Sequence, residues 1–66
     1  MKLIIDKEND AIYFRLDDSK IMESEEVEKG IVLDFDENEN IVGIEILNIS
    51  SRSKKIDLNS FQLETA

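Results

Sequence analysis

The sequence predicts a mostly β protein, α+β at the margin, built on a four-stranded antiparallel meander. Residues 31–47 form two arms rich in β-branched and aromatic residues around an acidic, amide-rich centre at 36–40, which is typical of two strands and a turn. Two further short apolar runs lie near the start of the chain. The chain has 66 residues and no cysteine or histidine, so we expect a single domain over 1–66 with a thin core.

The first two strands are expected at about 2–6 and 11–17, joined by a polar turn. Alternation in the second strand places Ile12 and Phe14 on one face and Tyr13 and Arg15 on the other. A loop of about four residues between the runs is an ordinary length for a hairpin. The start of the chain therefore predicts a β-hairpin.

The third and fourth strands are expected at about 25–36 and 41–47. The segment 25–29 is rich in glutamate, and we interpret it as the outer part of the third strand, with Gly30 as a bulge. A helical turn over 25–29 is the alternative. The four strands in chain order predict a meander with one strongly apolar face.

This predicted face needs a cover, because a single open sheet cannot bury it. Its members are Leu3, Ile5, Ile12, Phe14, Leu16, Ile31, Leu33, Phe35, Val42, Ile44 and Ile46. A helix, a folded-back tail or a second copy of the sheet would each serve. We expect residues 51–66 to form a C-terminal cover or tail, with a short helix within 48–55 capped by Asn48 or Ser50 and an irregular segment after it.

Four strings of this chain resemble a known family of small bacterial and archaeal proteins, domain of unknown function family 2283. They are Asp6-Lys-Glu-Asn-Asp-Ala-Ile-Tyr13, Glu25-Glu-Val-Glu-Lys-Gly-Ile31, Asp34-Phe-Asp36 and Ile41-Val-Gly-Ile-Glu-Ile-Leu-Asn-Ile-Ser50. The resemblance covers residues 3–50, so 1–50 is the family-like core. The family often has an aromatic residue where Ile5 stands, and a glycine in the turn where Glu39 or Asn40 stands.

The resemblance implies a miniature β or αβ domain with no established activity. Some members of that family resemble one half of two-gene cassettes that also encode a small ribonuclease-like toxin. The resemblance therefore implies an antitoxin-like role toward a basic partner.

The charge of the chain narrows the classes of partner. Sixteen acidic residues against eight basic ones give a net charge of −8, which repels nucleic acid and anionic membrane surfaces and attracts basic proteins. A small core without disulfides also favours self-association, so we expect a homodimer, a basic protein partner, or both. With no apolar run near the length of a membrane helix and no visible targeting signal, we expect a cytoplasmic protein.

One pattern is that of a calcium loop. Counted from Asp34, oxygen ligands fall at positions one, three, five and seven, and Glu45 falls at position twelve, as in an EF-hand. Position six is Glu39 where that loop needs glycine, and the flanks are strands. Oxygen-ligand metal binding through 34–45 is our alternative hypothesis, and a solvated hairpin turn with acidic residues guarding a sheet edge is our main interpretation.

A second pattern is a pair of carboxylates, Asp34 and Glu45, on the same face of the hairpin. Such a pair suits acid–base work, but no nucleophile with a base accompanies it, so we expect no enzyme and no catalytic, cofactor-binding or metal residues. We expect instead a protein–protein interaction module. Its predicted contact surface consists of Tyr13, Arg15, Val32, Asp34, Glu45 and Leu47.

Overall fold

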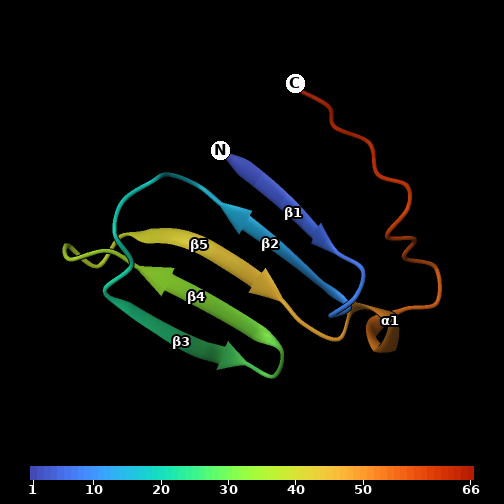
Figure 1. The fold of residues 1–66 in the computed structure, drawn as a ribbon, viewed down its shortest axis with the longest axis horizontal. Coiled ribbons are helices and arrows are strands. Elements are labelled where there is room, and N and C mark those ends of the chain that lie inside the picture. The colour runs from blue at the N-terminus through green and yellow to red at the C-terminus, as the bar shows by residue number, and fades with distance from the viewer.

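A computed structural model describes residues 1–66 as one five-stranded antiparallel sheet followed by a short helix (Figure 1). The elements are β1 (Lys2–Asp6), β2 (Ala11–Arg15), β3 (Glu23–Glu28), β4 (Ile31–Phe35), β5 (Ile41–Ile46) and α1 (Ile49–Arg52). The mostly β, antiparallel class is confirmed, but the prediction of four strands is wrong, because residues 25–36 form most of two strands.

The extra strand comes from a tight turn at Lys29 and Gly30. Gly30 has φ +77°, a left-handed conformation that glycine adopts without strain, and the chain reverses there instead of bulging. Both the single strand over 25–36 and the helical alternative for 25–29 are therefore corrected. A register shift does occur in this hairpin, but it lies between Glu26 and Glu28.

The order of the strands, β1-β2-β5-β4-β3, also corrects the predicted meander. After β2 the chain crosses to the far edge of the sheet, forms β3 and β4, and returns with β5 between β4 and β2 (Figure 1). The strand with the most buried residues thus takes the centre, and the glutamate-rich strand takes an edge where its side chains stay in water. Backbone bonds from Leu16 N to Val42 O (2.8 Å) and from Met22 N to Phe35 O (2.8 Å) hold the two ends of the crossover loop.

The register aligns side chains into rows that cross all five strands. One row is Leu3–Phe14–Ile44–Leu33–Glu25, and the next on the same side is Ile5–Ile12–Ile46–Ile31–Glu28. The eight aliphatic and aromatic members of these two rows are called the apolar face below. Each row ends in a glutamate on β3, so the acidic charge of this side is confined to one edge.

The opposite side, called the polar face, carries two rows of mixed character. They are Lys2–Arg15–Gly43–Asp34–Ser24 and Ile4–Tyr13–Glu45–Val32–Glu26. Successive residues of a strand point to opposite sides of a sheet, so the two faces follow from the same alternation.

The helix α1 is held at the end of β5 by the β1–β2 turn. Ile49 N donates to Asp10 O (3.0 Å), and the Asp10 carboxylate accepts from Ser50 N (3.1 Å) and Ser50 Oγ (2.6 Å). Asn48 precedes the helix with φ 54° and supplies no side-chain cap. The predicted short helix is present, but its cap comes from Asp10 rather than from Asn48 or Ser50.

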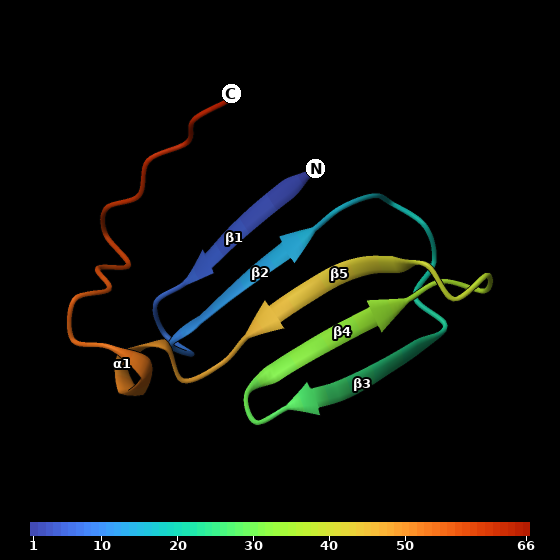
Figure 2. The ribbon, with the colours of Figure 1, turned by 180° about the vertical axis from the view of Figure 1, so that it is seen from behind.

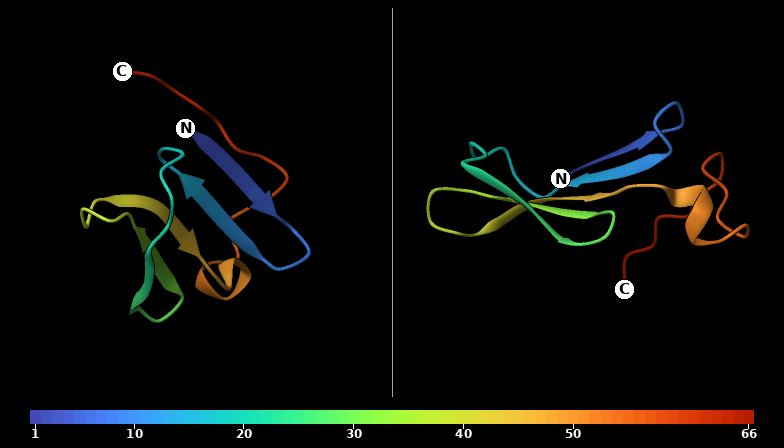
Figure 3. Two further views of the ribbon diagram at one scale, coloured as in Figure 1. Left: turned by 60° about the vertical axis from the view of Figure 1, so that its left-hand side comes forward. Right: turned by 90° about the horizontal axis from the view of Figure 1, so that it is seen from below.

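The C-terminal segment beyond α1 does not cover the apolar face, contrary to our expectation. Residues 53–66 contain only turns and extended chain, and the side chains of Phe61 and Leu63 are 61% and 83% exposed. The tail runs outside β1 and leaves the plane of the sheet (Figures 1 and 3). No second layer lies over either face (Figure 2).

The core is consequently very small. Ala11, Val42 and Ile49 are the buried hydrophobic residues, with Asp34 as the buried charged one. Seven members of the apolar face are half-buried, and Leu3 is exposed. No helix of the structure is long and apolar enough to cross a membrane.

Candidate functional site

The polar face brings together five of the six predicted contact residues. Tyr13 and Arg15 come from β2, Val32 and Asp34 from β4, and Glu45 from β5. The sixth, Leu47, follows the end of β5, where its N–H donates to Gly30 O (2.8 Å). Leu47 therefore lies at the β3–β4 turn, at the margin of this face.

Asp34 is the centre of a hydrogen-bond network on the polar face. Its Oδ2 accepts from Tyr13 Oη (2.7 Å), and its Oδ1 accepts from Ser24 Oγ (2.5 Å). The side chain is 8% exposed. A buried carboxylate needs donors for its oxygens, and two hydroxyl groups from separate strands supply them. The network ties β2 and β3 to β4.

Gly43 makes room for this network. A Cβ atom at position 43 would lie 2.5 Å from Tyr13 Oη and 2.8 Å from Asp34 Oδ2, inside normal contact distance. Gly43 stands between Arg15 and Asp34 in its row. Because glycine has no side chain, the hydroxyl of Tyr13 can reach across β5 to the carboxylate of Asp34.

Arg15 connects the network to the crossover loop. Its Nη1 donates to Tyr13 Oη (3.3 Å), its Nε donates to Asp17 O (2.6 Å), and its Nη2 donates to Ser19 O. The guanidinium thus has three partners within its own chain. The bonds to Asp17 and Ser19 hold the loop that leads from β2 to β3.

The tyrosine hydroxyl titrates unusually in this setting. Burial raises the pKa of Tyr13 above its ordinary value, and the hydrogen bond to Asp34 and the charge of that carboxylate raise it further. The hydrogen bond from Arg15 opposes this rise. The phenol of Tyr13 therefore stays protonated and donates the 2.7 Å hydrogen bond to Asp34.

The two carboxylates of the predicted acid pair lie on the same face but not opposite one another. In the register, Asp34 faces Gly43, and Glu45 faces Val32. The oxygens of Asp34 are bonded to the hydroxyl groups of Tyr13 and Ser24 rather than to Glu45. The bonds to Asp34 tie three strands of the sheet together.

The turn at 36–40 is organised from within by Asp36. Its carboxylate accepts from Asn38 N (2.9 Å), Asn40 N (2.9 Å) and Asn40 Nδ2 (3.2 Å). The backbone bond from Asn40 lowers the pKa of Asp36 below its usual value, as do further bonds from Asn40 and Asn38. Glu39 adopts φ 64°. The segment is thus a hairpin turn closed by its own residues, as expected, but it joins β4 to the central strand β5 and does not guard a sheet edge.

The predicted calcium ligands are not gathered around one point. Asp34 belongs to the polar-face network, whereas the Asp36 carboxylate is occupied by donors of its own turn. No group of three or more histidine, cysteine or acidic side chains is placed to hold a metal ion. The spacing in sequence resembles an EF-hand, but the strand geometry separates the oxygens.

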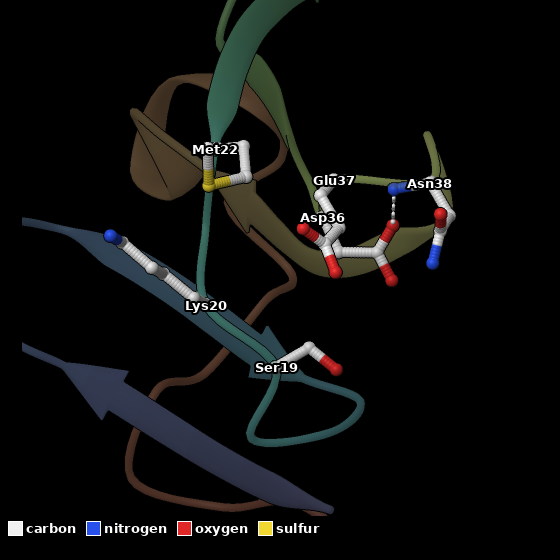
Figure 4. A pocket seen from close by; sticks show the side chains of 6 residues that line it. All are labelled: Ser19, Lys20, Met22, Asp36, Glu37 and Asn38. Atoms are coloured by element: carbon white, nitrogen blue, oxygen red, sulfur yellow. Dashed lines mark hydrogen bonds between the residues drawn. The ribbon is translucent and has the colours of Figure 1, made fainter.

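A shallow hollow lies between the crossover loop and this turn. Its walls are shown in Figure 4 and consist of Ser19, Lys20, Met22, Asp36, Glu37 and Asn38. The dashed line in Figure 4 marks the bond by which Asn38 N closes the turn on Asp36. Ser19 N donates to Asp17 Oδ1 (2.7 Å), so this wall of the hollow is held by a turn of the crossover loop.

Comparison with family models supplies one match, to the family described as Protein of unknown function (DUF2283), over residues 2–50. The match spans most of the chain. This protein belongs to the DUF2283 family. Comparisons with curated proteins and with solved structures gave no match.

The DUF2283 match covers the whole sheet and stops inside the helix α1. It includes all five strands, the polar-face network and the Asp10–Ser50 contact, whereas Arg52 and the tail lie outside it. The part of the fold shared with the DUF2283 family is thus the uncovered sheet. The tail, residues 53–66, lies outside the matched residues.

Two residues of the network were missed by the sequence analysis. Ser24 sits between glutamates in a segment without clear alternation, and Gly43 was counted as one more member of an apolar strand. A glycine inside an otherwise β-branched strand signals a close approach, and that signal was present at position 43.

Proposed function

We propose that this DUF2283 protein is a non-enzymatic protein–protein interaction module that uses its apolar face as the contact surface. The observation that supports this is the uncovered sheet: seven of the eight side chains of the apolar face are half-buried and one is exposed. Contiguous apolar surface of this kind typically marks an interaction site. Completing the burial of a half-exposed aliphatic side chain contributes roughly 1 kcal/mol, so eight such positions offer a substantial driving force.

The polar face, which we first expected to be the contact surface, is less suited to that role. Asp34 and Tyr13 already satisfy one another, and Arg15 is bonded to the crossover loop. Glu45 and Val32 remain at its surface, half-exposed. A partner would gain few new hydrogen bonds there, so we assign the polar face to stability of the sheet.

A basic protein is the class of partner that the charge favours. The net charge is −8, and the edge strand β3 exposes Glu23, Glu25, Glu26 and Glu28 beside its unpaired backbone. Charge of one sign along an edge speeds the encounter with a protein of the opposite sign. An antitoxin-like role, in which the module neutralises a small basic toxin, is the specific form of this proposal.

Co-expression with the product of a neighbouring gene, chosen for small size and basic charge, tests the proposal. We expect a complex in size-exclusion chromatography that weakens at high salt, because part of the attraction is electrostatic. Ile44→Lys, in the middle of the apolar face, is expected to abolish the complex. Val32→Lys places the same side chain on the adjacent strand but on the polar face, and is expected to leave the complex intact.

The outcome against the proposal is equally clear. A wild-type protein that stays monomeric, binds no hydrophobic dye and forms no complex with that basic protein would show that the apolar face has no partner. Equal loss of the complex in both variants would show that the contact does not depend on this face.

A further inference from the structure

We infer that the apolar face is covered by a second copy of this chain, in a two-layered sandwich in which β3 of each copy lies over β1 of the other. This inference rests on the proposed function, because it names the occupant of the same face; a basic protein would then meet the pair along the exposed glutamates of β3. Three observations carry it: the surface area of the single chain, the position of the glutamates in the rows, and the position of two lysines after β5.

The surface area of one copy is too large for a compact protein of its size. The chain exposes 5445 Å² at 7.6 kDa, whereas a compact monomer of that mass exposes about 4,300 Å². The excess is about 1,100 Å² per copy, or about 2,200 Å² for a pair, which matches the area buried in stable homodimers. The open face contributes part of this excess, and the exposed tail contributes the rest.

Two-fold symmetry allows two simple ways of stacking the apolar faces. If the axis runs across the strands, β3 lies over β3 of the partner, and the glutamates that end the rows face one another. If the axis runs along β5, β3 lies over β1 of the partner, and the glutamates of the two copies stand at opposite edges. Like charges held close together are destabilising, so the charge pattern selects the second arrangement.

The same arrangement packs the centre of the face well. The rotation places each row over the same row of the partner, in reverse strand order. The two copies of Ile44 therefore meet at the axis, and Phe14 lies over Leu33 of the partner subunit. Glu25 lies at the rim over β1 of the other copy, where its carboxylate keeps contact with water. Aligned sheets of this kind stack about 10 Å apart.

Two lysines after β5 suit the acidic strand in this arrangement. Lys54 and Lys55 lie at the start of the tail, which then runs along the β1 side (Figures 1 and 2). In the sandwich, that side of each copy adjoins β3 of its partner and its glutamates. Arg52 takes no part, because it donates to Lys29 O (2.9 Å) at the β3–β4 turn of its own copy. The rest of the tail carries no basic residue and offers apolar side chains for burial, which include Phe61 and Leu63.

Sedimentation equilibrium of the full chain tests the dimer. We expect wild type to sediment as a dimer at micromolar concentration. Ile44→Lys should raise the dissociation constant about a hundredfold or more, because it places an ammonium group in the apolar centre. Val32→Lys, matched in charge and on the opposite face, should leave the dimer unchanged. A wild type that is monomeric throughout overturns the inference.

Cross-linking tests the orientation, and the absence of native cysteine makes it direct. We would mix the Leu3→Cys and Glu25→Cys proteins, allow subunits to exchange, and treat them with a bismaleimide that spans about 10 Å. Products that join one chain of each kind support β3 over β1. Products that join two Glu25→Cys chains overturn that orientation. Glu45→Cys, on the polar face, controls for random collision.

The two proposals fail in different ways. If wild type is monomeric but Ile44→Lys alone abolishes the complex with the basic protein, a foreign partner covers the face, and the dimer is excluded while the interaction module stands. If wild type is monomeric and neither lysine variant changes any association, both proposals are excluded.

Discussion

At the scale of single residues, the most informative feature is the buried Asp34 with its two hydroxyl donors. The bonds from Tyr13 and Ser24 link the three strands β2, β3 and β4. Gly43 permits this contact because it carries no side chain. A buried acceptor that loses its donors costs about 1–3 kcal/mol, so each member of this cluster matters to the stability of the sheet.

We predict that Gly43→Ala lowers the free energy of unfolding by about 2 kcal/mol, because the new methyl group meets Tyr13 Oη and displaces the hydrogen bond to Asp34. Urea unfolding measures this. In a Tyr13→Phe background the oxygen is already absent, so the same substitution should cost less. Equal costs in the two backgrounds would contradict this explanation.

The single tyrosine gives a direct view of the same cluster. The chain has no tryptophan, so ultraviolet absorbance follows the ionisation of Tyr13 alone. Burial and the Asp34 carboxylate raise its pKa, and we expect phenolate to appear above the ordinary value of about 10. Because the folded-state pKa is the higher one, the contribution of Tyr13 to stability is complete below pH ~10 and is lost as pH rises through the folded-state pKa.

Asp34→Asn tests the electrostatic part of that shift. The variant removes the charge that repels the phenolate, so the pKa of Tyr13 should fall relative to wild type while remaining raised by burial. A tyrosine that titrates at the same pH in both proteins would contradict the contact with Asp34.

At the scale of elements, the alternation of residues along each strand predicted which face a side chain takes, whereas the order of the strands in the sheet was not predicted. The period of two correctly placed Tyr13, Arg15 and Asp34 on one face, because that period follows from strand geometry alone. The strand β3 was only partly visible in the sequence, since Val27 is the one apolar residue in Glu23–Glu28 and the segment is a strand through its pairing with β4. Insertion of β5 between β2 and β4 depends on long-range pairing that no local pattern encodes.

The helix α1 depends on a residue forty positions earlier in the chain. We predict that Asp10→Ala exposes the first N–H groups of the helix and costs about 1 kcal/mol, the usual price of a lost cap. Amide hydrogen exchange at Ser50 should accelerate. Asp57→Ala, which removes a comparable local bond to Asn59 N in the tail, is the control and should leave exchange at Ser50 unchanged.

At the scale of the whole molecule, stability should depend on pH through the carboxylates of the turns. Hydrogen bonds lower the pKa of Asp6, Asp17 and Asp36, those of Asp6 and Asp36 chiefly from Asn9 and Asn40. A lowered folded-state pKa gives a contribution that is present above the unfolded value of about 3.9 and is lost as pH falls through the folded value.

We therefore predict that Asp36→Asn is less stable than wild type at neutral pH, and that the difference shrinks as pH falls below about 4. Chemical unfolding at a series of pH values measures this. Asp18→Asn, in the crossover loop, is a matched change of charge. A difference between wild type and Asp36→Asn that stays constant down to acid pH would contradict the role of the turn.

The free edge of β3 bears on whether this protein forms filaments in solution. A sheet whose two outer strands both have unpaired backbone groups can join edge to edge with its neighbours and, because that union does not close on itself, grow into a filament. The glutamates along β3 keep neighbouring molecules apart at neutral pH. Replacement of these glutamates by neutral residues would remove the repulsion, so the same strand that guards against fibre formation would become the place where fibres begin.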